Sequence, residues 1–231
     1  MARKDLLSEA IADAKAVKET ALANAKLALE EAFTPKLQSM ISAKLAEEMD
    51  DELPAIDLGS ERTATMIAVG SNHSCALLDN ATVKCWGRSN SGQLGYNDTA
   101  TRGDGAGEMG NALPAISFAA GRTATAIAAG ASHTCALLDN AQVVCWGDNA
   151  YGQLGQGNMD NIGDGIGPTV ATTATIDLGT GRTAIAISAG DLHTCALLDN
   201  ATVKCWGSAG NGRLGTGATN DRGDDPNEIE P

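Results

Sequence analysis

The residue types that do most protein chemistry are concentrated in one fifteen-residue stretch that occurs three times. All three histidines, all six cysteines and all three tryptophans of the 231-residue chain lie within residues 73–87, 133–147 and 193–207. Each copy reads His-x-Cys-Ala-Leu-Leu-Asp-Asn-Ala-x-Val-x-Cys-Trp-Gly. Thiols and an imidazole at this spacing could form disulfides or bind zinc.

The spacing of the cysteines favours disulfides. The two cysteines of a copy are ten positions apart across an Asp-Asn-Ala turn, so a hairpin centred on Asn80 places Cys75 opposite Cys85. Residues directly opposite each other have Cα atoms roughly 4.5–5.5 Å apart, within reach of a disulfide. We therefore predict the pairs Cys75–Cys85, Cys135–Cys145 and Cys195–Cys205, in an oxidising setting. The alternative is three pairs of buried free thiols, and a one-residue bulge in the turn would spoil the facing geometry.

Two metal sites are the competing hypotheses. His73, Cys75 and Cys85 could offer zinc three ligands and an open position, but the motif has no carboxylate placed to support the histidine. Calcium could bind clustered aspartates in the loops, which match neither an EF-hand nor the nonapeptide calcium pattern. We expect solvated turns, with no metal and no cofactor. The loop aspartates are Asp98, Asp104, Asp160, Asp164, Asp221, Asp224 and Asp225.

The repetition itself argues against catalysis. An active site normally needs asymmetry, whereas the histidines and tryptophans stand at equivalent places in every copy. The chain also has no serine-centred nucleophile elbow and no glycine-rich phosphate loop ending in lysine. We predict no enzymatic activity and assign structural packing roles to His73, His133, His193, Trp86, Trp146 and Trp206.

The net charge of −13 limits the partners. Neither half of the chain has the basic stripe that phosphate groups or an anionic membrane surface would require. No run of about eighteen apolar residues exists, so we expect no membrane-spanning segment. The N-terminus lacks the apolar region and cleavage site of a signal peptide. We therefore predict a protein partner, no nucleic acid and no membrane, and assign no definite location.

The first part of the chain differs sharply in composition from the rest. Residues 1–58 contain no glycine, and apolar residues recur there at steps of three and four, which is helical spacing. We expect a helical arm over 1–52, with helices over about 5–33 and 35–49. The arm could fold back as a hairpin, act as an assembly helix that docks on another chain, or be partly disordered.

Residues 53–231 form the repetitive part, with units of about 53–112, 113–172 and 173–231. Each unit combines short apolar segments, a hairpin, a Gly-x-Leu-Gly turn and a glycine- and aspartate-rich loop. Short strands and glycine turns at a fixed long period are typical of a propeller or a solenoid. Arg62, Arg122 and Arg182 recur before the strands, and we expect each to pair with an aspartate of a neighbouring unit.

The motif Ile-x-x-Gly-x-x-His-Thr-x-Ala-Leu, Val-x-x-Trp-Gly and Gly-Gln-Leu-Gly, here over 127–137, 143–147 and 152–155, resembles the regulator of chromosome condensation repeat. The resemblance covers about residues 53–224 and implies a mainly β fold, a partial β-propeller of three four-stranded blades after the helical arm. Complete propellers of the family have about seven repeats. The cysteine pairs resemble the variant found in bacterial, algal and phage-borne members. Residues 5–31 are also similar to prohead core (scaffold) proteins of marine tailed phages.

Three functions remain open from the sequence. The first is a non-enzymatic structural or protein-interaction module, in which a helical docking arm carries blades that present variable loops; in the version that the phage resemblance implies, this module belongs to a virion. The second, implied by the family's founding member, is a guanine nucleotide exchange regulator of a small GTPase. The third is a calcium-dependent surface or carbohydrate binder. Because three blades leave open sheet faces, we also expect self-assembly through the arm and the open blade edges.

Overall fold

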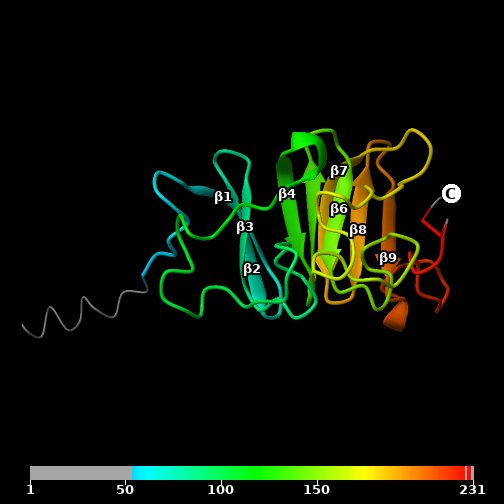
Figure 1. Ribbon diagram of the computed structural model, residues 1–231. Helices are drawn as coiled ribbons and strands as arrows, with labels where there is room; N and C mark the ends of the chain where they lie inside the picture. The colour runs from blue at the N-terminus through cyan, green and yellow to red at the C-terminus, as the bar shows by residue number, and fades with distance from the viewer. Residues whose placement is uncertain (1–53, 227, 230–231) are drawn as a thin grey trace, which may run out of the picture. The chain divides into compact units, whose positions relative to one another are not determined.

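The computed structural model describes residues 54–226, 228 and 229. The expected helices over 5–33 and 35–49 lie outside these residues. The described part consists of three separate antiparallel sheets that follow one another in chain order (Figure 1). This is the mainly β architecture of three repeats that the sequence predicts.

Each sheet has three strands in the order of the sequence. We call each sheet with its following loop a blade: blade 1 (residues 64–118), blade 2 (124–178) and blade 3 (184–229). Two short 3-10 helices, Ala119–Gly121 and Gly210–Gly212, lie in the connections. The strands are β1 (Ala64–Val69), β2 (His73–Leu78) and β3 (Val83–Gly87) in blade 1, β4 (Ala124–Ala129), β5 (His133–Leu138) and β6 (Val143–Gly147) in blade 2, and β7 (Ala184–Gly190), β8 (His193–Leu198) and β9 (Val203–Gly207) in blade 3.

The central hairpin of each blade has the register expected from a turn centred on its asparagine. In blade 1, Leu77 pairs with Val83 and Cys75 pairs with Cys85. The turn is closed by a bond from the Leu78 amide to the Thr82 carbonyl, and Ala81 has a positive φ of 61°. A tight turn followed by one left-handed residue is a common way to connect two antiparallel strands. The other two blades repeat this register.

The outer edge of each blade differs from the four-stranded blade that the resemblance implies. Gly87 forms only an isolated bridge with Arg102, and the Ile116 amide donates to the Val83 carbonyl at 2.8 Å. Blade 2 repeats both features one unit later. The intervening segment is rich in glycines with positive φ, which turn the chain and cannot continue a strand. In the described residues, the fourth position of blade 1 therefore consists of one isolated bridge, in which Gly87 and Arg102 exchange two hydrogen bonds, and one further bond from Ile116 to Val83.

The core lies within the hairpins and in the two seams between blades. Val83 and Val143, on the third strands, are fully buried, as are Leu94 and Leu154 in the Gly-Gln-Leu-Gly turns. Blade 2 lies between the other two, and every residue of β5 and β6 is buried. The position of a blade in the row therefore decides how much of its surface is covered.

Candidate functional site: the seams between blades

The cysteines face each other on neighbouring strands and are joined. The structure contains the disulfides Cys75–Cys85, Cys135–Cys145 and Cys195–Cys205, with Cα atoms 4.1, 4.0 and 4.0 Å apart. All three bonds lie within a single hairpin, so they hold β2 to β3, β5 to β6 and β8 to β9. They strengthen each blade, and two of their sulfurs also reach the next blade: Cys75 Sγ lies 4.0 Å from Thr134 Oγ1, and Cys135 Sγ lies 3.7 Å from Thr194 Oγ1.

The tryptophans also connect neighbouring blades. The indole Nε1 of Trp146 in blade 2 donates to the carbonyl oxygen of Gln93 in blade 1 at 3.0 Å. Trp206 in blade 3 donates in the same way to Gln153 in blade 2, also at 3.0 Å. Both indoles are completely buried. Trp86, the equivalent residue of blade 1, is only half-buried because no described blade precedes it.

The histidines cross the same seams in the opposite direction. His73 Nε2 lies 2.9 Å from Thr134 Oγ1, and the Thr134 hydroxyl donates to the Gln93 carbonyl at 2.9 Å. A hydroxyl has one hydrogen to donate, so Thr134 must accept its second bond from the Nε2–H of His73. His133, Thr194 and Gln153 repeat the chain across the second seam, at 3.0 and 3.0 Å.

This tautomer leaves the other ring nitrogen unprotonated. Nδ1 of each histidine is buried without a hydrogen-bond partner among the described residues. Burial lowers the pKa of His73 to about 4 and, with smaller contributions from the charges of His73 and His193, that of His133 to about 3. The pKa of His193 is also lowered, mainly by burial and then by Arg213, against the opposing effect of Asp191. The seam histidines are therefore neutral structural donors at neutral pH.

Glycines make the close approach possible. A Cβ on Gly130 would clash with the His133 ring and lie 2.5 Å from the carbonyl oxygen of Gly190 in the next blade. A Cβ on Gly95 would lie 2.8 Å from Nε1 of Trp146, and a Cβ on Gly155 would lie 2.9 Å from Nε1 of Trp206. Contacts this short exclude any side chain, so the turn glycines form the slots that receive the tryptophans.

The two metal hypotheses find no geometry to support them. The disulfides consume the thiols that zinc would need, and Nε2 of His73 is bonded to a hydroxyl. Asp98, one of the proposed calcium ligands, forms an ion pair with Arg102 at 2.7 Å, which lowers its pKa. Across residues 54–226, 228 and 229, no three histidine, cysteine or acidic side chains converge as a metal-binding group.

The repeated arginines pair differently from the expectation. Arg62 lies 3.3 Å from Asp79, and Arg122 lies 3.4 Å from Asp139, so each arginine binds an aspartate of its own blade. The expectation of a neighbouring unit's aspartate is wrong because the first strand runs antiparallel to the second. The bond from the Asp79 amide to the Thr63 carbonyl extends that ladder and brings the two side chains together.

The seam roles of Thr134, Thr194 and the carbonyls of Gln93 and Gln153 were not predicted from the sequence. A signal was available, because a hydroxyl follows each histidine and a glutamine lies between the glycines of the first two turns. Their repetition at sixty-residue steps marks them as parts of the same seam. Which copy contacts which is a property of the packing and cannot be read from one repeat.

Comparison with known proteins agrees with this arrangement. Two family models of the regulator of chromosome condensation (RCC1) repeat match the chain, one over residues 66–93, 124–153 and 184–213, the other over 82–137 and 140–197. The chain belongs to this family. The three matches of the first model begin within β1 and at the starts of β4 and β7, so each covers the first strand of a blade and the hairpin that follows.

Two relatives show what share of a related protein's length this chain spans. It is 32% identical over 179 residues to the ultraviolet-B receptor UVR8 of Arabidopsis thaliana, which covers 77% of this chain and 36% of that protein. It is 32% identical over 154 residues to the human E3 ubiquitin-protein ligase HERC2, covering 65% of this chain and 3% of HERC2. The chain therefore spans about a third of the first relative and a small part of the second.

Solved structures share the fold at low identity. Human WBSCR16 superposes with a TM-score of 0.55 and 21% identity, covering 71% of this chain and 39% of that one. Yeast RCC1 (Prp20), solved bound to Kap60, gives a TM-score of 0.52 and 21% identity, covering 73% and 37%. Among the residues that the structure describes, no helix is long and apolar enough to cross a membrane.

Proposed function

We propose that the chain is a non-enzymatic protein-interaction module, in which RCC1 blades form a rigid support and the loops between copies bind a protein partner. The observation that carries this proposal is a pair of strongly exposed apolar side chains in one loop. Met159 and Ile166, which are 61% and 92% exposed, both lie in the loop 156–172, where the three copies differ. Exposed apolar residues on a variable loop favour protein contact.

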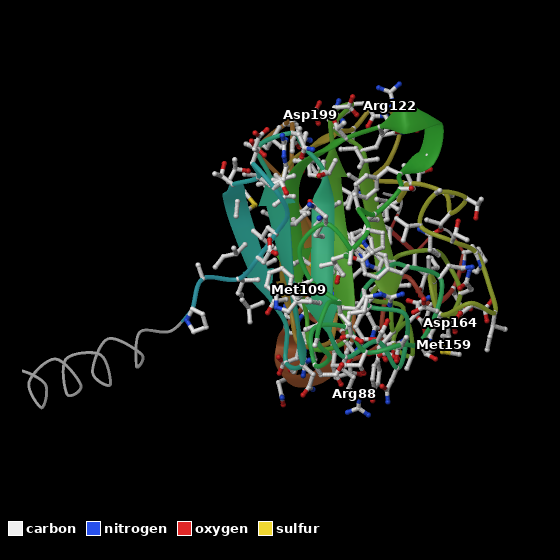
Figure 2. All side chains as sticks on the ribbon, turned by 60° about the vertical axis from the view of Figure 1, so that its left-hand side comes forward. Arg88, Met109, Arg122, Met159, Asp164 and Asp199 are labelled. Atoms are coloured by element: carbon white, nitrogen blue, oxygen red, sulfur yellow. A yellow bond between two sulfur atoms is a disulfide. The ribbon has the colours of Figure 1, made fainter. Side chains whose placement is uncertain are left out.

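The loops lie at one end of the blades and the repeated ion pairs at the other. Figure 2 shows Arg88, Met159 and Asp164 at one end, and Arg122 and Asp199 at the opposite end. Because the identical residues of the copies are used in seams and hairpins, the loop end is the surface that varies. Recognition that distinguishes one partner from another needs such variation.

The loop of blade 1 is fixed in place before any partner binds. Arg102 pairs with Asp98 and lies over the Tyr96 ring at 4.5 Å from its centroid. The Tyr96 hydroxyl donates to the Cys85 carbonyl at 3.0 Å and accepts from the Cys85 amide at 2.9 Å. A loop that is already ordered loses less conformational entropy on binding, which favours affinity.

Affinity capture with the full chain tests the proposal. The bait is compared with a Met159→Ser/Ile166→Ser variant and with a control variant, Ile185→Ser, which removes a 57% exposed apolar residue from strand β7 of blade 3. We expect a partner recovered by the wild-type chain and the control and reduced at least about tenfold by the loop variant, as for a buried interface contact. Equal recovery by all three baits would contradict the loop assignment.

The other functions are tested separately. Nucleotide exchange on a small GTPase is a prediction from the family's founding member, and a nucleotide-release assay with the purified chain measures it directly. Calcium-dependent binding would be lost in chelator. A virion location rests on the resemblance of residues 5–31 and is tested by mass spectrometry of purified particles. Self-assembly through the open blade faces is a further partner prediction, and it uses a surface other than the loops.

A further inference from the structure

The outer face of blade 1 exposes residues whose equivalents are buried in the seams. We call the face that carries the tryptophan the leading face of a blade, and the face that carries the Gly-x-Leu-Gly turn the trailing face. Ile67 on the leading side of blade 1 is 68% exposed, whereas its equivalent Ile127 in blade 2 is 6% exposed against blade 1. Trp86 is half-buried, whereas Trp146 is completely buried. The leading face of blade 1 is therefore apolar and exposed, whereas the equivalent face of blade 2 is covered by blade 1.

Figure 2 turns this side of the molecule towards the viewer, with Met109 in front of the strands of blade 1. A Cβ on Gly103 would lie 3.2 Å from Met109 Sδ, just as one on Gly223 would lie 3.3 Å from Ile229 Cδ1. Ile229 also reaches into the preceding blade, where its Cδ1 would lie 2.9 Å from a Cβ on Gly155. Met109 is thus the blade 1 counterpart of a residue that fills a seam.

The outer face of blade 3 has the matching slot, and it is unfilled by any described residue. Gly215 has a φ of 69°, the same value as Gly155, yet a Cβ on Gly215 would meet nothing within 4 Å. The same holds for Gly212, whereas Gly152 is covered by the loop residues Gly223 and Asp224 of the next blade. A surface hollow of about 380 Å³ opens here, lined in part by Val203, Leu214, Gly215 and Thr216.

The polar groups of this face are equivalent to those that the preceding blade supplies in each seam. His193 is half-buried, and no described hydroxyl lies within hydrogen-bond distance of its Nε2, whereas His73 and His133 each meet a threonine. Blade 1 carries Ser74 at the position of those threonines, which keeps the hydroxyl. Arg213 replaces glutamine in the turn, but the seams use only the backbone carbonyl of that residue.

We propose that the trailing face of blade 3 binds the leading face of blade 1 of a second copy of the chain, forming a third seam of the same kind. Trp86 of one copy enters the slot at Gly215 of the other and donates to the Arg213 carbonyl. His193 Nε2 donates to the hydroxyl of Ser74. The Gly103–Asp104 loop covers Gly212, which places the Asp104 carboxylate beside the positive charge of Arg213.

A second copy is the occupant because each face lacks what the other supplies. The slot at Gly215 has the backbone conformation of a slot that holds a tryptophan, and Trp86 is the tryptophan that is only half-buried. Such a head-to-tail contact leaves one free face at each end, so copies either close into a ring or extend further. This inference rests on the proposed interaction role and names a partner for a surface other than the loop 156–172.

Sedimentation velocity of the full chain with a pair of complementary variants tests the inference. Trp86→Ala breaks the leading face and keeps the trailing face. Gly215→Asn fills the slot and keeps the leading face, and asparagine tolerates a positive φ. We expect the wild-type chain at multiples of 23.5 kDa and each variant alone at 23.5 kDa. An equimolar mixture should form a species of twice 23.5 kDa, because one intact face of each kind remains.

The controls separate this inference from the proposed function and from misfolding. The loop variant Met159→Ser/Ile166→Ser should associate like the wild-type chain even where it captures no partner. Circular dichroism and thermal unfolding establish that each variant is folded, and His193→Ala with Ser74→Ala forms a second complementary pair if either first variant unfolds. A wild-type chain that sediments as a single copy over the whole accessible concentration range would overturn the inference. So would folded variants that associate alone, or that fail to form the mixed dimer.

Discussion

The two seams and the two end faces of the repeat body contain equivalent residues in different surroundings. In a seam, a tryptophan indole donates to a carbonyl of the preceding blade, and a histidine bonds a hydroxyl of the following one. On the end faces, Trp86 and His193 lack those partners among the described residues, although the backbone slot at Gly215 keeps its φ of 69°. The turn at Gly215 therefore has the backbone conformation of a seam without a described neighbour, whereas the hydrogen bonds of Trp146 and His73 need the adjacent blade.

The largest expected effect comes from removing equivalent tryptophans. Trp146→Ala should lower the free energy of unfolding by about 3–5 kcal/mol, because it empties a completely buried site. Trp86→Ala should cost less in the single copy, since the side chain is only partly buried there. Urea unfolding at low protein concentration measures both values. Equal losses would show that the end face is as covered as the seam.

The pH dependence of stability should come largely from the seam histidines. The pKa of His73 falls from 6.5 in the unfolded chain to about 4 in the folded one, so unfolding takes up a proton within this range. The stabilisation is complete above pH 6.5 and is lost as the pH falls towards 4, by about 3 kcal/mol at 1.4 kcal/mol per pKa unit. Urea unfolding across this range should show the loss.

Substitution of His133 provides the control for the pH experiment. A His133→Asn variant should lose part of the pH slope below pH 6.5, because the pKa of His133 is lowered to about 3 in the folded chain. The variant will be less stable at every pH, so the slope and not the absolute stability is compared. An unchanged slope between pH 6.5 and 4 would contradict a buried, neutral His133.

The disulfides share one contribution that does not depend on the seams. Each closes a loop with a sequence separation of 10, which predicts about 2–3 kcal/mol of stabilisation from restriction of the unfolded chain. Replacing Cys135 and Cys145 by alanine should cost more than replacing Cys195 and Cys205, because the first pair is fully buried and Cys135 Sγ also contacts Thr194 across the second seam. Non-reducing mass spectrometry of the native chain should find no alkylatable thiol, and six alkylatable thiols would contradict the pairing.

The smallest expected effect is a difference in stability between alanine variants of Gly155 and Gly215, which have the same φ of 69°. Gly155→Ala and Gly215→Ala carry the same penalty of about 1 kcal/mol for a Cβ at positive φ. Only the first places its Cβ against a tryptophan, so it should cost about 1–3 kcal/mol more. Thermal unfolding under conditions where the chain is a single copy compares the two. A Gly215→Ala variant as unstable as Gly155→Ala would mean that the slot is already occupied.

The sequence predicts the hairpins and the disulfides well because both depend on local register. A turn centred on Asn80 fixes which residues face each other, and the structure pairs Cys75 with Cys85 accordingly. The repeat period likewise predicts three similar sheets. The absence of a regular fourth strand in the described residues is harder to foresee, because the glycines that interrupt it also suit a turn between strands.

The seam contacts are less accessible to sequence reasoning. The acceptor for Trp146 is the backbone carbonyl of Gln93, and any residue at that position would provide one. The partner of Arg122 was predicted wrongly because the register of the first two strands, and not the repeat, decides which aspartate is near. Contacts between copies depend on how blades pack, which the residues of one repeat do not encode individually.

Amide and indole hydrogen exchange of the ¹⁵N-labelled chain tests the central claim most directly, because each of the three tryptophans gives one indole N–H signal. We expect the signals of Trp146 and Trp206 to exchange slowly at every concentration, since both indoles are buried and hydrogen-bonded. The Trp86 signal should exchange quickly in the dilute chain and become protected as copies associate. A Trp86 indole that exchanges quickly at all concentrations, while the other two stay protected, would contradict the claim that the end faces form a third seam.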